Sequence, residues 1–249
     1  MPRRVSHSLL DPWLSAPLKG LYPRLPIPRG FPPEGIVLAG HACAIAGAAG
    51  FACSSRWWWG GLLAAIGVAL NHFADLLDGT HARATSQCRN GGELLDHFTD
   101  PLSFSYWMIG VGIAAAAPLW GTAAVVCIYA TAVLTNIRAK ITGEFALAAF
   151  GPTEFKTLLV LFGVAMSAAA AGLFGAVDPS TIAFWFLAPL VTVGAAQLAV
   201  QVVRSVREMN AAGVPSDETE WITRGVSSTA DHPRVDPSPG RSSARAPAR

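Results

Sequence analysis

The sequence predicts an all-α integral membrane protein with six transmembrane helices, preceded by a short amphipathic helix that lies in the membrane interface. Of the 249 residues, 52% are hydrophobic and only 14% are charged. The stretch between Asp100 and Arg138 contains no charged residue. Apolar stretches of this length match the roughly 20 residues that a helix needs to cross a bilayer, and a water-soluble domain of this size would struggle to cover them.

The N-terminal segment, residues 1–34, is too polar and too rich in proline for a secretory signal. Asp11 and Pro12 are typical of an N-cap and a first helical residue. Trp13 and the three leucines that follow it can share one helical face. We therefore expect a short helix in the membrane surface, with a frayed leader as the alternative.

Six apolar segments follow this N-terminal part. They cover residues 35–55, 58–78, 91–115, 118–138, 154–176 and 180–203. Together they make a predicted six-helix membrane domain over residues 35–206. Near its end the chain turns to Ser, Pro, Arg and Asp and loses its periodicity, so we expect residues 213–249 to form a disordered cytoplasmic tail.

The cations orient the predicted spans. With both termini and the loops after the second and fourth spans on one side, Arg56 is the only one of the 18 Lys and Arg residues on the other side. By the positive-inside rule both termini are cytoplasmic, which predicts a multi-pass protein of the inner or plasma membrane. Three consecutive tryptophans, Trp57 to Trp59, then lie at the outer interface, where indole rings anchor well; core packing is the alternative.

Four aspartates lie around the loop between the second and third spans. Asp75 and Asp78 are three residues apart, and Asp96 and Asp100 are four apart, so each pair projects from one face of a helix. Carboxylates within membrane helices are costly and usually mark a functional pathway. An all-oxygen cage of this kind suits Mg²⁺, or Mn²⁺ in its place. The alternative for any single aspartate is a helix cap or a structural ion pair.

Small and basic residues accompany these acids. Gly92 lies one turn before Asp96 and leaves room for a ligand. Gly79 is expected to end the first of the two helices and to let backbone approach a bound group. Arg83 is suited to a forked contact with a phosphate. Acid pairs, a metal ion and an arginine together indicate a pyrophosphate substrate.

The run D-x-x-D-G-x-x-A-R-x8-G-x3-D-x3-D covers 26 residues without a departure. It is met by Asp75, Asp78, Gly79, Ala82, Arg83, Gly92, Asp96 and Asp100. The pattern resembles the signature of the CDP-alcohol phosphotransferases, also called CDP-alcohol phosphatidyltransferases. The resemblance implies a membrane transferase of phospholipid synthesis that moves a substituted phosphoryl group from a CDP-alcohol to a hydroxyl acceptor and releases CMP. It also implies two divalent ions and a homodimer.

The resemblance assigns roles to these residues. The metal ligands would be Asp75, Asp78, Asp96 and Asp100, and the CDP site would be formed by Asp75, Gly79, Ala82, Arg83 and Gly92. Asp100 would deprotonate the acceptor hydroxyl, ligate the second metal, or do both. The sequence does not separate these roles.

Two segments bear on the choice of alcohol. G-E-L-L-D-H-F-T-D at 92–100 and the stretch at 142–154 are similar to the choline and ethanolamine phosphotransferase branch. They favour CDP-ethanolamine or CDP-choline as donor and a diacylglycerol-like acceptor, with His97 and Glu154 near the head group. His97 could instead be a polar residue inside the bundle, and Glu154 could favour the start of the fifth span.

A second set of residues favours a different substrate pair. Arg138, Lys140 and Lys156 could bind a phosphorylated acceptor such as glycerol phosphate or inositol phosphate, with CDP-diacylglycerol as the donor. The alternative is that they are positive-inside loop charges.

Other functional classes are less well supported. A metal-ion transporter would also be lined by intramembrane acids, and a non-catalytic scaffold would keep the fold, but neither explains the glycines, Ala82 and Arg83 of the run. The net charge of +2 gives no reason to expect a nucleic-acid partner. The four cysteines have no metal-type spacing. Small residues such as Gly47, and the glycines at 60, 61 and 67, predict close helix packing, with dimerisation as the alternative.

Overall fold

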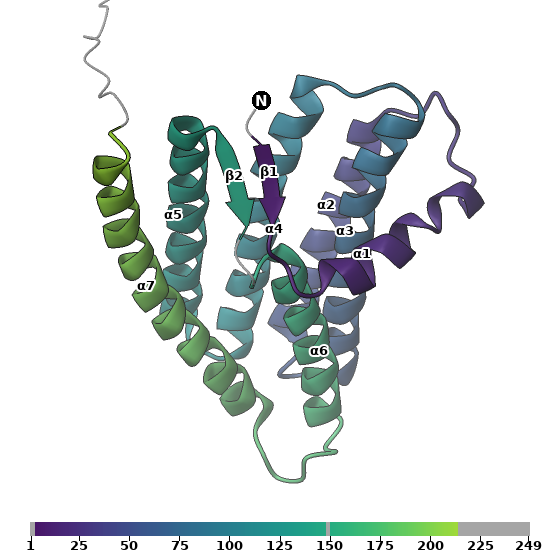
Figure 1. Ribbon diagram of the computed structural model, residues 1–249. Helices are drawn as coiled ribbons and strands as arrows, with labels where there is room; N and C mark the ends of the chain where they lie inside the picture. Colours follow the sequence, from purple (N-terminus) through teal and green to yellow (C-terminus); the bar gives the residue numbers. More distant parts are fainter. Residues whose placement is uncertain (1–2, 148–149, 214–249) are drawn as a thin grey trace, which may run out of the picture. The chain divides into compact units, whose positions relative to one another are not determined.

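The computed structural model describes residues 3–147 and 150–213, and these residues are predominantly helical (Figure 1). The α-helices are α1 (Asp11–Lys19), α2 (Pro33–Cys53), α3 (Trp58–Ala84), α4 (Asn90–Ala114), α5 (Pro118–Thr142), α6 (Pro152–Ala170) and α7 (Pro179–Ala211). A 3₁₀ turn, η1 (Tyr22–Arg24), follows α1, and two short strands, β1 (Arg3–Ser6) and β2 (Glu144–Leu147), pair with each other. The strand pair is an addition to the predicted all-α fold.

Within the described residues, five helices are long and apolar enough to cross a membrane. They are α2, α3, α5, α6 and α7. The protein is therefore an integral membrane protein. These helices overlap five of the predicted spans, and α4 overlaps the sixth, at 91–115; six crossings stay a prediction. Beyond its first residue, the predicted disordered tail at 213–249 lies outside the described residues.

The helix that carries the first acid pair is longer than predicted. We expected a span of 58–78 that ends at Gly79, but α3 continues to Ala84, so that prediction is wrong. A glycine inside a helix costs only about 1 kcal/mol relative to alanine. His81, two residues beyond the glycine, compensates for it: its ring is fully buried, and its Nδ1 and Nε2 atoms lie 2.9 Å from the Tyr22 hydroxyl and the Phe31 carbonyl oxygen respectively. Tertiary contacts thus extend the helix past its weakest residue.

Glycines bring the backbones of α2, α3 and α6 into contact. A Cβ atom at Gly67 on α3 would lie 2.6 Å from the Cα atom of Gly47 on α2, and one at Gly163 on α6 would lie 2.8 Å from the carbonyl oxygen of Gly61. Between helices in a bilayer there is no hydrophobic driving force, so close backbone packing supplies much of the attraction. The predicted role of these glycines in packing is confirmed, and α3 is held between α2 and α6.

Aromatic side chains also pack between the helices. Trp107 on α4 is fully buried and donates its indole N–H to the Ala44 carbonyl oxygen on α2 at 2.9 Å. Phe162 on α6 stacks on Phe186 of α7, with ring centroids 3.8 Å apart. By contrast, the three predicted interface tryptophans at 57–59 are 44% to 54% exposed, so core packing does not account for them.

The N-terminal segment docks onto the helices. α1 begins at Asp11, and its N-cap is Leu10, so the prediction that Asp11 is the N-cap is wrong by one residue. Trp13 is 77% exposed and available to a membrane surface. β1 runs parallel to β2, with Arg3 opposite Glu144, and Figure 1 shows the two strands side by side. The start of the chain therefore contacts the segment between α5 and α6.

The glycine contacts predict that a glycine-to-alanine substitution lowers the free energy of unfolding at a packed position but not at an open one. Gly67→Ala should lower the free energy of unfolding by about 1–3 kcal/mol, because the new Cβ would overlap the α2 backbone. The matched control is Gly194→Ala on α7, where a Cβ would meet no atom within 4 Å; there the helix should gain up to about 1 kcal/mol. Thermal unfolding in detergent micelles measures both, and equal shifts would contradict the packing described.

Candidate active site

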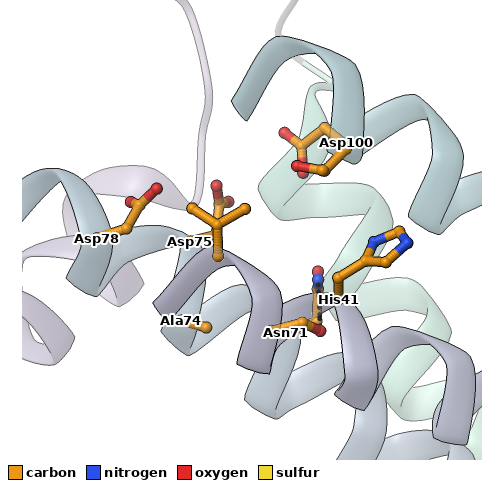
Figure 2. Close-up of a pocket in the computed structure, with 9 residues that line it drawn as sticks. His41, Asn71, Ala74, Asp75, Asp78 and Asp100 are labelled. Carbon is orange, nitrogen blue, oxygen red and sulfur yellow. Dashed lines mark hydrogen bonds between the residues drawn. The ribbon is translucent and has the colours of Figure 1, made fainter. Parts of the chain in front are cut away.

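Three of the four aspartates line one pocket, which we call the acidic pocket (Figure 2). Its walls are formed by Val37, Gly40, His41, Asn71, Ala74, Asp75, Asp78, Thr99 and Asp100. They come from α2, α3 and α4. Figure 2 shows the carboxylates of Asp75 and Asp100, from different helices, facing a common space. The predicted meeting of the two acid pairs is therefore present for the side chains that the structure describes.

The wall opposite the acids is formed by α2. Gly40 lets α2 approach α3 closely, because a Cβ at that position would lie 2.7 Å from the Cβ of Ala74. Asn71 donates from its side-chain amide to the Gly40 carbonyl oxygen at 3.1 Å. Beside it, the His41 ring packs at 5.4 Å from the Tyr106 ring. The pocket therefore lies where α2 and α3 are in close contact.

A lysine side chain lies between two of the acids. The Nζ atom of Lys156, on α6, is 2.8 Å from Oδ2 of Asp75 and 3.0 Å from Oδ1 of Asp100. The lysine side chain is only 1% exposed, whereas those of the two acids are 24% and 29% exposed. Its ammonium also lies 5.6 Å from the centre of the Phe104 ring. The sequence predicts Lys156 as a possible acceptor-site residue, but its described contacts are with two of the predicted metal ligands.

The remaining residues of the signature extend from this pocket. The Asp78 carboxylate accepts a hydrogen bond from the backbone N–H of Gly79. The Arg83 guanidinium lies over Gly79, where a Cβ would be 3.3 Å from its Nη1 atom. Gly92 has open space around it, since a Cβ there would meet nothing within 4 Å. Ala82 is half-buried on α3, and Asp96 lies on α4 one turn before Asp100, with a side chain outside the described part of the structure.

Glu154 lies in the first turn of α6, which agrees with the alternative that it favours the start of this helix. Its Oε1 atom accepts hydrogen bonds from Oγ of Ser8 at 2.6 Å and from the backbone N–H groups of Leu9 and Leu10 at 2.7 and 3.0 Å. Its Oε2 atom accepts from the backbone N–H of Gly151 at 2.8 Å, which caps the helix. Both carboxylate oxygens of Glu154 therefore accept hydrogen bonds from groups of the protein itself.

The other predicted acceptor residues do not line the acidic pocket that the described residues form. Arg138 pairs with Glu208 of α7 at 2.9 Å and donates to the Ser205 hydroxyl at 3.1 Å. Lys140 is exposed near the end of α5. The His97 ring lies 4.9 Å from the Phe145 ring of β2. Lys156 alone among the four basic and histidine candidates reaches the acids through a described contact.

Sequence analysis did not single out His41 and Asn71, although both line the pocket. Each is a polar side chain within a long apolar stretch, which is the signal that could have identified them. Thr99 lies within the signature itself, next to Asp100.

The donor set of the acidic pocket fits a hard divalent cation. Carboxylate oxygens are the ligands that Mg²⁺ and Mn²⁺ prefer, and an ammonium group between two of these carboxylates shows that the pocket attracts positive charge. Among the described side chains, no three Asp, Glu, His or Cys groups lie close enough to hold one ion together. Three acids thus line the same pocket, but two of them, Asp75 and Asp100, form ion pairs with Lys156.

Comparison with known proteins agrees with this chemistry. The family model described as CDP-alcohol phosphatidyltransferase matches residues 33–195. Human cholinephosphotransferase 1 is 41% identical over 58 residues, which cover 23% of this chain and 14% of the human protein. The chicken cholinephosphotransferase 1 is 32% identical over 116 residues, covering 44% of this chain and 34% of the chicken protein. The matched parts thus span about a third or less of these relatives.

The matched residues 33–195 contain the described helices from α2 to α6, about half of α7 and all three acids of the pocket. Since the family model covers well over half of the sequence, the chain belongs to the CDP-alcohol phosphatidyltransferase family.

Proposed function

We propose that this protein is a phospholipid-synthesis transferase that moves a substituted phosphoryl group from a CDP-alcohol to a hydroxyl acceptor and releases CMP. The observation that carries the proposal is the convergence of Asp75, Asp78 and Asp100 on one pocket, in a chain of this family. A scaffold would not need acids gathered at such cost inside a membrane domain.

The residues around the pocket divide the work on the donor. Two divalent ions, Mg²⁺ or Mn²⁺, held by Asp75, Asp78, Asp96 and Asp100, would neutralise the pyrophosphate and stabilise CMP as it leaves. Arg83 is exposed beside Gly79 and can donate two parallel hydrogen bonds to a phosphate. The open space around Gly92 leaves room for the nucleotide, and Ala82 completes that side.

Asp100 is positioned to act on the acceptor. Its side chain is 29% exposed, so a hydroxyl group can reach it from outside the bundle. It would take the proton of that hydroxyl, whose oxygen then bonds to the phosphorus that carries the alcohol while the bond to CMP breaks. A positioned base of this kind accelerates a reaction by about 10²–10⁴-fold. Asp100 could ligate the second ion in the same cycle.

For the substrates we favour CDP-choline or CDP-ethanolamine with diacylglycerol. The support is the likeness to cholinephosphotransferase 1, and His97 lies on α4 within the similar segment. Glu154 would act on a head group only through the N-terminal residues that it binds.

A second substrate pair has one observation in its favour. The buried ammonium of Lys156 lies beside the acids and could bind the phosphate of glycerol phosphate or inositol phosphate, with CDP-diacylglycerol as donor. Arg138 and Lys140 would join it only after a rearrangement, since Arg138 is paired with Glu208.

The arrangement in the membrane belongs to the same proposal. Six crossings, cytoplasmic termini and a cytoplasmic acidic pocket agree with the distribution of Lys and Arg along the chain, and we expect a homodimer by likeness to the family.

Replacement of single carboxylates tests the site. Asp78→Asn and Asp100→Asn should each lower metal-dependent CMP release by at least about 100-fold, because each removes a charge from the pocket while it keeps the side-chain shape. Asp178→Asn is the matched control: this aspartate is exposed and caps α7 away from the pocket. CMP release by protein purified in detergent measures all three, and retained turnover in either pocket variant would contradict the assignment.

A substrate panel tests the choice of alcohol. With Mg²⁺ present, CMP release should occur with CDP-choline or CDP-ethanolamine plus diacylglycerol. Release only with CDP-diacylglycerol plus glycerol phosphate, inositol phosphate or serine would favour the second substrate pair. No release with any pair would revive the transporter and scaffold alternatives.

A further inference from the structure

Lys156 is a charged side chain with no role in the proposed reaction of CDP-choline or CDP-ethanolamine with diacylglycerol. It is 1% exposed, and a charge buried to that extent costs several kcal/mol unless partners compensate it. Its described partners are the two carboxylates of Asp75 and Asp100 and the face of the Phe104 ring. The lysine and two of the predicted metal ligands therefore depend on each other.

The position of the ammonium is set by the helix that carries it. Three residues before Lys156, the Thr153 hydroxyl donates to Oδ1 of Asp11 at 2.5 Å, and Glu154 binds the N-terminal segment through Ser8. Further along α6, Gly163 packs directly on the α3 backbone. The first turn of α6 is thus bound to the N-terminal segment and the middle of the helix to α3, so Lys156 lies on a helix with tertiary contacts on both sides of it along the chain.

The pocket brings several like charges together. Among the described side chains, the carboxylates of Asp75, Asp78 and Asp100 line it, and the ammonium of Lys156 offsets one negative charge. A divalent ion held by the predicted ligands would need the carboxylates of Asp75 and Asp100, which Lys156 contacts at Oδ2 and Oδ1 respectively. Two cations at one pair of acids repel each other, because unit charges a few ångströms apart interact strongly in a low dielectric.

We propose that Lys156 is a tethered counter-cation: it holds Asp75 and Asp100 together in the metal-free protein and competes with the divalent ion for them. This inference rests on the proposed metal-dependent function. Lys156 lowers the affinity for the ion, and its charge reduces the repulsion between the carboxylates of Asp75 and Asp100. Phe104 offers the displaced ammonium a second contact, since an aromatic face attracts a cation.

Metal binding by the full-length protein in detergent tests this competition. The variants are Lys156→Met, which keeps the length but removes the charge, and Lys19→Met as the control, at an exposed lysine in the last turn of α1. The free Mn²⁺ concentration is followed by electron paramagnetic resonance. Lys156→Met should lower the Kd for Mn²⁺ by about tenfold or more, and Lys19→Met should leave it unchanged. A Kd that is unchanged or higher in Lys156→Met would overturn the proposal. If the lysine only positioned the metal ligands, its removal would weaken binding of the ion and raise the Kd.

Thermal unfolding provides a readout without added substrate. In EDTA, Lys156→Met should melt below the wild-type protein, and Mn²⁺ should raise the melting temperature of the variant by more than that of wild type, because the variant binds the ion more tightly. Lys156→Arg covers the case in which the methionine variant fails to fold. Its guanidinium can hold carboxylates with two parallel hydrogen bonds, so its Kd for Mn²⁺ should rise above that of wild type; a tighter or unchanged Kd in this variant would overturn the proposal.

The two proposals fail in different ways. If wild type releases no CMP from any donor while the Mn²⁺ affinities shift as stated, the proposed reaction is wrong and the counter-cation stands. If CMP is released and the affinities do not shift, the reaction stands and the counter-cation is overturned.

Discussion

Carboxylates inside a membrane-spanning bundle need a positive partner, and that requirement organises this protein. α3 and α4 contribute the acids, and α6 contributes the one ammonium that lies between them. Glycine contacts bring the backbone of α3 close to α6, which carries the ammonium, and to α2, which forms part of the pocket wall. The packing of these helices and the charge of the pocket therefore depend on the same geometry.

The ion cluster also determines what surrounds it. Lys156 follows the first turn of α6, and that turn is held in place by Thr153 and Glu154, which bind residues of the segment around α1. The same segment reaches α3, where the Tyr22 hydroxyl meets the buried His81 ring. The N-terminal residues are therefore part of the active-site support, although they lie outside the matched family region, which begins at residue 33.

The helices and the acid signature could be predicted from sequence because both are local properties. A span is recognised by about 20 consecutive apolar residues, and the acid pairs by their spacing on one helix. The extension of α3 past Gly79 could not be predicted, since it depends on contacts of His81 with Tyr22 and Phe31. Nor could the pairing of Lys156 with Asp100, 56 residues apart, because only the tertiary packing that places α6 beside the N-terminal half of α4 brings these two side chains together.

The link between Glu154 and Ser8 joins residues 146 positions apart, and this has a consequence for biosynthesis. A ribosome releases the chain from its N-terminus, so the first residues wait while four long helices are made and inserted. During that interval the acids of α3 and α4 are present in the nascent protein without Lys156. Once α6 is made, Lys156 can pair with the acids, and Glu154, two residues earlier, can bind the N-terminal segment. The charge of the pocket and the docking of the N-terminal segment are therefore both completed late in synthesis, by the same short stretch of chain.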